Sequence, residues 1–463
     1  MSAVSEQNRS PRSRRLPRLL IGYSLLVSAS ILAFQAIRAV GERAYGGAGT
    51  GTVPPPATAS ADVIPHVLLA LVAIIVAART LGALFERLHQ PPVMGEIVAG
   101  ILLGPSTLGY FAPAASQFLL PPEVVRFIGL ISHVGVIFFM FLVGVQLESS
   151  HLRGRGESAI AISHASIIVP FLLGAGLALL LYPTYGVNGV PFTGFALFLG
   201  VAMSVTAFPV LARILADRGM QRTPLGTLAL TVASVDDVTA WFLLAFVVGV
   251  VRAKMGSAVL TGALTFAYII AMVAAVRPAV RWFVDRHPEA TRSVFAAALV
   301  GLLLSALTAE VIGIHAVFGA FLMGVVIPAR SSLARELVTK LEDLTVVVFL
   351  PAFFAFTGLR TKIGLVQTAS QWLVCGLIVA TATAGKFGGT LVGARLARVE
   401  WRDAVRLGIL MNTRGLMELV VLNVALDLGI LSPIMFAMMV IMAVVTTFMT
   451  TPLLDLVAAR DTA

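Results

Sequence analysis

The sequence has 463 residues, of which 58% are hydrophobic and only 12% are charged, so its main solvent must be lipid and a soluble globular class is excluded. The formal net charge of +10 does not indicate a nucleic-acid partner, because the Arg and Lys residues are scattered over short loops instead of forming one basic face. The lone cysteine, Cys375, excludes a disulfide framework and a Cys-based metal site.

Three regions are predicted along the chain. Residues 1–62 are expected to hold a basic cytoplasmic N-terminus, an extra transmembrane helix that is retained after synthesis, and an outer linker rich in Gly, Pro and Thr. A signal peptide that is cleaved off is the alternative interpretation of the first apolar stretch. Residues 63–457 are expected to form the membrane domain. Residues 458–463 are expected to be a short cytoplasmic tail with no soluble regulatory domain attached.

The membrane-spanning helices follow from the apolar stretches. A hydrocarbon core of about 30 Å needs roughly 20 apolar residues per helix, and stretches of that length recur with only short breaks. We therefore predict an all-α polytopic membrane protein with about 13 to 14 transmembrane helices. The expected spans are 16–37, 63–84, 92–111, 123–147, 158–182, 191–216, 224–250, 257–276, 292–309, 313–328, 343–359, 365–395, 403–428 and 432–457.

The orientation follows from the basic residues, which concentrate in cytoplasmic loops of membrane proteins. If the basic N-terminus lies inside, the inner loops hold most of the Arg and Lys residues: Arg79, Arg87, Arg153, Arg155, Arg218, Arg222, Arg277, Arg281, Arg286, Arg292, Arg330, Arg335, Lys340, Arg395, Arg398, Arg402 and Arg406. The outer loops hold few. We predict a multi-pass protein of a bacterial inner membrane, with both termini cytoplasmic.

A weak internal repeat relates the two halves of the chain. The segment GILLGP at Gly100 is similar to GVVIP at Gly324, and IFFMFLVGVQL at Ile137 is similar to VFLPAFFAFTGL at Val348. The break around Ser204 to Pro209 then corresponds to the break around Asn412 to Gly415, and the offsets fall from about 224 to 214 to 207 residues. Because each copy has an odd number of helices, the copies must be inverted.

Ionisable residues at bilayer depth are costly and therefore rare without a partner or a function. Asp236 and Asp237 lie midway along one span, and Lys386 lies midway along another. Adjacent helical residues point about 100° apart, so one of the two acids can meet Lys386 while the other faces a cavity. Arg414 and Glu418 lie four residues apart on a third span and can pair; a purely structural ion pair is the alternative interpretation for them.

Pro209 marks a helix break, because it removes a backbone donor and loosens the turn near Ser204 and Thr206. Half-helix ends and unpaired carbonyls at such a break can coordinate a dehydrated Na⁺ or K⁺. A carboxylate beside the break can then hold either a proton or a metal cation. Mutually exclusive occupancy, combined with alternating exposure to the two sides, is sufficient for exchange transport.

At these residues the chain resembles the second monovalent cation:proton antiporter family, which includes bacterial potassium efflux systems, bacterial sodium/proton antiporters and plant cation/proton exchangers. The similarity runs from about Val63 to Leu454, and its most specific segments are PPVMGEIVAGILLGPSTLG, SVTAFPVLARIL, SVDDVTAWFLL and MNTRGLMELVVLN. The resemblance implies an inverted-repeat sodium/proton antiporter fold with broken crossing helices, in which scaffold and core subdomains are interleaved along residues 63–457. It also implies a homodimer whose core domain moves the ion in an elevator-like motion while the scaffold holds still.

The resemblance also implies the roles of individual residues. It makes Asp237 the acid that carries H⁺ or the transported Na⁺ or K⁺, makes Asp236 the partner of Lys386, and implies electrogenic exchange. The complete candidate set comprises the cation- and proton-binding residues Asp237, Asp236, Thr206 and Ser204, the salt-bridge partner Lys386, and the supporting residues Arg414, Glu418, Asn412 and Pro209.

Two further points remain open in the sequence. Glu96, at the cytoplasmic start of a span, is a candidate for a funnel through which ions enter, with a solvated helix-start acid as the alternative. The function has two alternatives as well: a carrier for an organic anion or other solute, and a channel-like regulatory membrane protein on the same fold. No catalytic triad, phosphate loop or metal motif is visible, so neither an enzyme nor a resident cofactor is expected.

Overall fold

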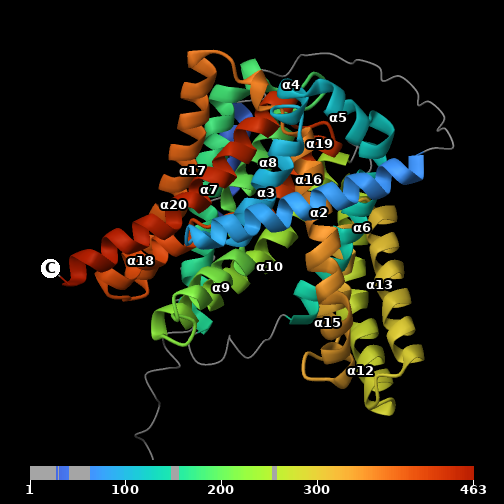
Figure 1. The fold of residues 1–463 in the computed structure, drawn as a ribbon. Helices are drawn as coiled ribbons and strands as arrows, with labels where there is room; N and C mark the ends of the chain where they lie inside the picture. The colour runs from blue at the N-terminus through green and yellow to red at the C-terminus, as the bar shows by residue number, and fades with distance from the viewer. Residues whose placement is uncertain (1–27, 30, 41–62, 147–155, 253–257, 463) are drawn as a thin grey trace, which may run out of the picture.

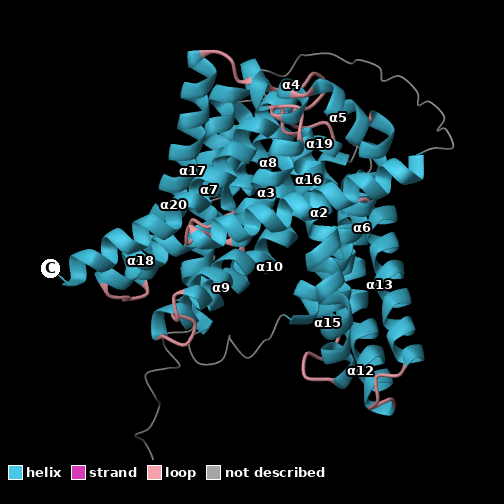
Figure 2. Cartoon of the chain, viewed as in Figure 1, coloured by secondary structure: helices cyan, strands magenta, loops and turns pink. Residues whose placement is uncertain are grey.

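The computed structural model describes residues 28–29, 31–40, 63–146, 156–252 and 258–462. Regular secondary structure in this part of the chain is entirely helical, with no strand (Figure 2). Eleven of the described helices are long and apolar enough to cross a membrane, or twelve if one bent pair counts as a span. Two shorter apolar helices, Ile31–Val40 and Ala316–Val326, lie at the positions of two more expected spans. The predicted all-α polytopic class is confirmed.

Several span boundaries differ from the expected ones. The span expected over 257–276 continues to Arg286, because a π-helical turn carries the helix past Arg277 and Pro278. The span expected over 343–359 begins earlier, at Ser332, with an amphipathic helix. Most of the expected first span lies outside the described residues, as do the Gly- and Pro-rich linker and the last residue of the tail.

The membrane helices form two groups whose members contact one another. We call the first group the panel; it consists of α2 (Val63–Arg87), α3 (Pro92–Leu103), α6 (Pro122–Gln146), α13 (Arg292–Ile312), α14 (Ala316–Val326), α15 (Ser332–Leu344), η3 (Thr345–Phe349) and α16 (Leu350–Arg360). Figure 1 shows α6, α13 and α15 together on one side of the molecule, with α2 running across it.

We call the second group the core bundle. It consists of α7 (Gly156–Tyr185), α8 (Phe192–Ser204), α9 (Phe208–Asp217), α10 (Pro224–Arg252), α17 (Ala369–Leu396), α18 (Trp401–Met411), α19 (Leu416–Asp427) and α20 (Pro433–Thr462). α7 packs along both α8 and α17, and α20 packs against α17, α18 and α19 (Figure 1).

Besides the helix Ile31–Val40, short and connecting elements complete the described part of the chain. They are α4 (Leu108–Phe111), α5 (Pro113–Leu119), η4 (Ile363–Leu365), and the connecting span made of α11 (Ala258–Ala271), η2 (Met272–Val276) and α12 (Arg277–Arg286). The connecting span joins α10 of the core bundle to α13 of the panel. It contacts both groups, because α11 packs against α10 of the core bundle and also against α13 of the panel.

Glycines allow the panel helices to cross closely. A Cβ atom on Gly100 of α3 would overlap the backbone of Phe354 in α16, and one on Gly358 of α16 would overlap the backbone of Gly100. Likewise, a Cβ atom on Gly144 of α6 would overlap the α14 backbone, and one on Gly324 of α14 would overlap the α6 backbone. The two contacts are equivalent under the repeat predicted from the sequence, since Gly324 corresponds to Gly100 and Gly358 to Gly144 at the expected offsets. The contacts therefore agree with two related halves.

Replacing Gly358 with Ala should destabilise the protein, because the new methyl group has no room against the α3 backbone. Overpacking of this kind costs roughly 1–3 kcal/mol, and more where backbone must move. Thermal unfolding in detergent should show a lower midpoint. Gly376→Ala in α17 is the matched control, since nothing lies within 4 Å of the added Cβ, and its midpoint should not fall. Equal midpoints for the two variants would contradict the tight crossing.

Candidate functional site

The first helix break separates α8 from α9. α8 ends at Ser204, the backbone is extended at Val205 and Ala207, and α9 begins at Phe208. Pro209 lies in the first turn of α9, where a missing backbone N–H removes no helical hydrogen bond. The break that the sequence predicts around Pro209 is present in the fold.

The second break separates α18 from α19, whose axes are bent by 44°. The two breaks contact each other directly. The backbone N–H of Ala207 donates to the Thr413 carbonyl at 3.0 Å, and the Thr206 hydroxyl lies 3.2 Å from the Met411 carbonyl. Non-helical backbone at membrane depth is therefore buried in protein at this crossing, where its polar groups find partners.

Asp236 of α10 lies beside the crossing and is fully buried. One carboxylate oxygen accepts a hydrogen bond from Ser163. The other lies 2.8 Å from the Ser166 hydroxyl, 3.0 Å from the Thr206 hydroxyl and 2.8 Å from Lys386 Nζ. Burying an ionised carboxylate costs several kcal/mol unless it is paired and hydrogen-bonded, and Asp236 meets both conditions.

Lys386 of α17 is also fully buried. Its ammonium group has three protons to donate, and it has three close acceptors besides the longer contact to the Ser166 hydroxyl. Nζ lies 2.8 Å from Asp236 Oδ2, 2.6 Å from the Ser204 carbonyl and 3.0 Å from the Ser166 carbonyl. Lys386 therefore holds α7, α8 and α10 together around one buried ion pair.

Asp237 differs from its neighbour. It is only 3% exposed, and its Oδ1 has no hydrogen-bond partner in the described part of the chain. The Phe208 backbone N–H, at the start of α9, interacts with this carboxylate, and the charges of Asp236 and Lys386 act on it. A buried carboxylate with an unsatisfied oxygen is unfavourable by itself, so this position suits a group that binds a cation or a proton.

Arg414 connects the two breaks. Its guanidinium group lies 2.6 Å from the Ala202 carbonyl and 2.7 Å from the Met203 carbonyl, and 2.9 Å from Glu418 Oε2. The pair with Glu418 was expected from the sequence, whereas the contacts with the last carbonyls of α8 were not. A cation at a helix C-terminus interacts favourably with the helix dipole, so Arg414 and Lys386 together stabilise the end of α8.

The overall sequence matches the family described as "Sodium/hydrogen exchanger, transmembrane" over residues 61–456. The chain belongs to this family. Among curated proteins, it is 45% identical over 392 residues to the Na⁺/H⁺ antiporter NhaS4 of Synechocystis, covering 84% of this chain and 96% of that protein. The similarity therefore extends over nearly the whole length of the Synechocystis protein.

Two eukaryotic relatives of this exchanger are longer. The Cation/H⁺ antiporter 17 of Arabidopsis thaliana is 39% identical over 84% of this chain and 48% of that protein. The K⁺/H⁺ antiporter 1 of Saccharomyces cerevisiae is 33% identical over 81% of this chain and 44% of that protein. The exchanger thus spans about half the length of these relatives.

Among solved structures, the exchanger is similar to the sodium proton antiporter MjNhaP1 from Methanocaldococcus jannaschii. The TM-score is 0.61 at 14% sequence identity, and the match covers 85% of this chain and 95% of that one. A likeness at this identity shows the fold. The predicted family and the predicted antiporter fold are confirmed by these comparisons.

Sequence reasoning missed two residues of the exchanger's buried cluster, Ser163 and Ser166 of α7. Hydroxyls in membrane helices usually donate to a backbone carbonyl one turn earlier in the same helix, as the Thr390 hydroxyl does to the Lys386 carbonyl. Ser163 and Ser166 bond instead to Asp236. Their spacing of three residues, which places them on one helix face, is the only signal in the sequence.

Three more of the expected site residues are located by the structure. The Ser204 hydroxyl lies against the carbonyls of Gly200 and Ile167, so Ser204 contributes its carbonyl rather than its hydroxyl to the cluster. Asn412 is buried at the crossing, and its Oδ1 has no partner among the described residues. Glu96 is 8% exposed on α3, close to Gly82 of α2. The alternative interpretation of Glu96 as a solvated helix-start acid is therefore wrong. The role of Glu96 in ion access stays a prediction.

Proposed function

We propose that this protein exchanges a monovalent cation, Na⁺ or K⁺, for H⁺ across a membrane, with Asp237 as the group that carries either ion. The observation that carries the proposal is the contrast between the two adjacent acids. Asp236 is held by three hydroxyls and Lys386, whereas Asp237 keeps a buried oxygen without a partner.

The buried charges support a monovalent cation. Within the described core bundle the fully or nearly fully buried acids are Asp236, Asp237 and Glu418, and the buried bases are Lys386 and Arg414. With every group ionised, the cluster therefore has one negative charge in excess. One proton or one alkali ion at Asp237 neutralises this excess, and both at once would leave a buried positive charge. Electrostatics thus favours the mutually exclusive occupancy that exchange requires.

The same charges argue against the alternative substrates. A carrier for an organic anion needs surplus buried positive charge at its site, whereas acids outnumber bases here. The relatives are named as cation/proton antiporters, and the family is one of transporters rather than of enzymes in the usual sense. We include in the proposal that exchange needs no resident cofactor.

Purified protein in proteoliposomes with an imposed pH gradient tests the proposal. Adding Na⁺ or K⁺ should dissipate the gradient, as followed with a pH-sensitive dye, while choline at the same concentration should not. A gradient that collapses without any alkali cation would favour a channel-like protein. A gradient that no cation affects, in vesicles shown to contain folded protein, would contradict exchange altogether.

We further propose that the core bundle moves relative to the panel during exchange, so that Asp237 meets each side in turn. A polar cluster joins the two groups at the end that the basic residues assign to the outside. Arg360 of α16 lies 2.6 Å from Asp427 of α19, and His133 of α6 lies 3.4 Å from the same carboxylate. Asn423 of α19 accepts from Arg360 at 3.2 Å and donates to Thr357 of α16 at 2.8 Å. We call these five residues the outer latch.

At the opposite end, the guanidinium group of Arg213 in α9 lies 2.7 Å from the carboxylate of Glu86 in α2, and this ion pair joins the core bundle to the panel. Both side chains are about half exposed. Exposed pairs of this kind contribute little, typically below about 1 kcal/mol. The outer latch has more partners, and its central pair is less exposed, with Arg360 21% and Asp427 32% exposed. The contacts therefore support a state that is closed more firmly at its outer end.

Cross-linking the outer latch should stop exchange if the two groups must separate there. The Arg360→Cys/Asp427→Cys variant, in a Cys375→Ala background, would be treated with a short bifunctional methanethiosulfonate reagent and assayed in proteoliposomes. We expect the linked protein to lose most of its activity and to regain it on reduction. Each single-cysteine variant with the same reagent is the control. Undiminished exchange by fully linked protein would contradict movement at this contact.

Orientation and assembly complete the proposal. We propose that the protein lies in a bacterial inner membrane with both termini in the cytoplasm, because of the distribution of its Arg and Lys residues. We also propose a homodimer, because four sequence segments resemble the cation:proton antiporter family. Light scattering of the protein–detergent complex gives the mass of the assembly. Labelling of cysteines introduced at Arg222 and Lys362 from one side of the membrane gives the orientation.

A further inference from the structure

The connecting span between the core bundle and the panel is only slightly buried in the described part of the protein. Of the eleven candidate spans, the one over Leu260–Arg286 is the least buried. Apolar side chains project from it, including Phe266 at 67% and Ile270 at 48% exposure. In a membrane protein such a face contacts lipid, so the end of this span meets the lipid headgroups.

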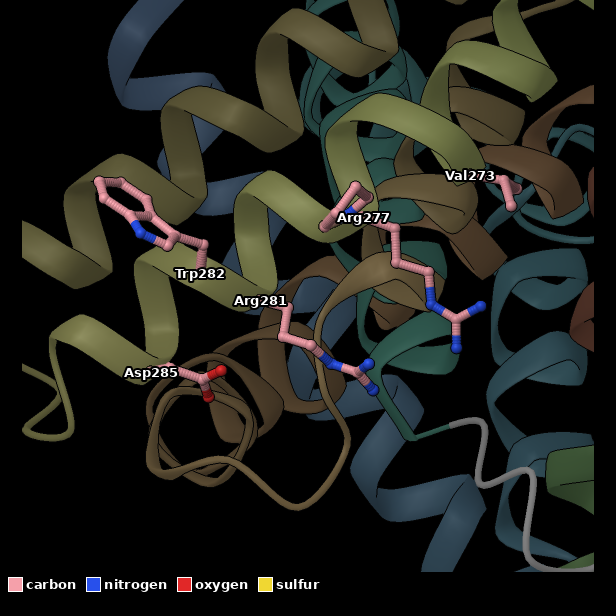
Figure 3. Close-up of a pocket in the computed structure, with 6 residues that line it drawn as sticks. Val273, Arg277, Arg281, Trp282 and Asp285 are labelled. Carbon is pink, nitrogen blue, oxygen red and sulfur yellow. The ribbon is translucent and has the colours of Figure 1, made fainter.

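A surface hollow of about 540 Å³ lies at that end of the span. It is lined by Val273 of η2 and by residues of α12: Arg277, Pro278, Arg281, Trp282 and Asp285. Figure 3 shows the guanidinium groups of Arg277 and Arg281 extending toward the same side of α12, one helical turn apart. The hollow therefore presents two parallel cationic groups at the edge of a lipid-facing surface.

These two arginines differ from most others near the same membrane face. Arg218 pairs with Asp455, and Arg395 lies over the Trp401 ring. Arg277 and Arg281 form no hydrogen bond, ion pair or ring contact within the described residues. Arg281 does not pair even with Asp285, although the two lie four residues apart on one helix. Their donors remain available for a ligand.

Trp282 fixes the depth of the hollow in the membrane. Trp282 is 62% exposed, and the Arg286 guanidinium lies over its ring, 5.6 Å from the ring centroid. Exposed tryptophans on membrane proteins concentrate at the level of the lipid headgroups. The arginines beside Trp282 are thus at the depth of lipid phosphates, and guanidinium groups bind phosphate oxygens in a bidentate fashion.

We propose that this hollow binds the headgroup of an anionic phosphodiester lipid of the phosphatidylglycerol type. The phosphate binds Arg277 and Arg281, and the glycerol hydroxyls donate to Asp285. The charges match, because two arginines and one aspartate leave a single positive charge for a single negative phosphodiester. A phosphatidylcholine headgroup has no donor for Asp285, and a phosphatidylethanolamine headgroup has a donor but no net negative charge to balance the second arginine. The lipid would be held on the connecting span, next to the joint between the two helix groups.

Lipid-dependent thermal unfolding of the purified, delipidated protein in neutral detergent tests the proposal. A ligand that binds the folded state raises the unfolding temperature. We expect phosphatidylglycerol to raise it, and phosphatidylcholine, phosphatidylethanolamine and inorganic phosphate not to. In the Arg277→Gln/Arg281→Gln variant, the phosphatidylglycerol concentration that gives half of the effect should increase by on the order of tenfold. The unliganded variant should unfold at the wild-type temperature, since neither arginine has a described partner.

The matched control is Arg222→Gln/Arg292→Gln, which removes two exposed arginines outside the hollow and should keep the wild-type response. Loss of the response in both double variants would show a general charge effect and overturn the site. An undiminished response in Arg277→Gln/Arg281→Gln would overturn it as well. A response to phosphatidylethanolamine or to inorganic phosphate equal to that for phosphatidylglycerol would show a different ligand and overturn the lipid assignment. Unfolding is measured without a cation gradient, so the result is independent of whether the protein exchanges ions.

Discussion

Replacing Asp237 with Asn should abolish cation-dependent proton flux while leaving the protein folded. The amide keeps the size and shape of the carboxyl group, but it takes up no proton and has no negative charge to hold Na⁺ or K⁺. We also expect the variant to unfold at the same temperature as the wild type or a higher one, because it no longer buries a carboxylate with an unsatisfied oxygen. Proteoliposome flux and thermal unfolding in detergent measure the two effects.

The combination of lost flux and retained stability separates an ion carrier from a structural residue. Asp343→Asn, at an exposed position of α15, is the matched control and should leave both quantities unchanged. Flux at the wild-type level in Asp237→Asn would remove Asp237 from its assigned role. A large fall in its unfolding temperature would show that the carboxylate has structural partners that compensate its burial, which also contradicts the proposal.

The sequence predicted those parts of the fold whose signals are local or compositional. Long apolar stretches gave the spans, and Pro209 and Gly415 marked the breaks. The repeat between Gly100 and Gly324 predicted equivalent helices, and the structure places both glycines at equivalent close crossings. Ionisable residues inside apolar stretches stand out by composition alone, and their similar depths predicted that one of the two adjacent acids meets Lys386. The choice of Asp236 came from the family resemblance, and the structure contains that pair.

The parts that the sequence did not predict depend on tertiary contacts. Nothing local distinguishes Ser163 and Ser166 from other membrane hydroxyls, since their partner Asp236 lies on another helix. The contact of Arg414 with the α8 carbonyls requires the two breaks to cross, and a local i,i+4 pattern shows only its pairing with Glu418. The extension of the connecting span past Arg277 depends on a π-helical turn, for which apolar periodicity gives no signal.

Replacing Lys386 with Ala should destabilise the protein strongly, because it leaves Asp236 ionised and buried without its cation. Removing one partner of a buried pair typically costs about 3–5 kcal/mol. The carbonyls of Ser166 and Ser204 lose a donor as well. In protein that still folds, the pH profile of exchange should move to more alkaline values, because two adjacent carboxylates repel each other once the buried cation is gone. Thermal unfolding and flux measured across a range of pH check both effects.

The double variant Asp236→Asn/Lys386→Ala separates the cost of an orphaned charge from the value of the pair. With both charges removed, the amide oxygen at position 236 still accepts from the hydroxyls on one side of the group, and the amide NH2 can donate to a hydroxyl oxygen on the other. Most of the stability lost in Lys386→Ala should then return, as a double-mutant cycle would show. Because Asp237 stays in place, some cation-dependent flux should return as well. A double variant as unstable as Lys386→Ala alone would mean that Lys386 acts through the α8 carbonyls instead of through Asp236.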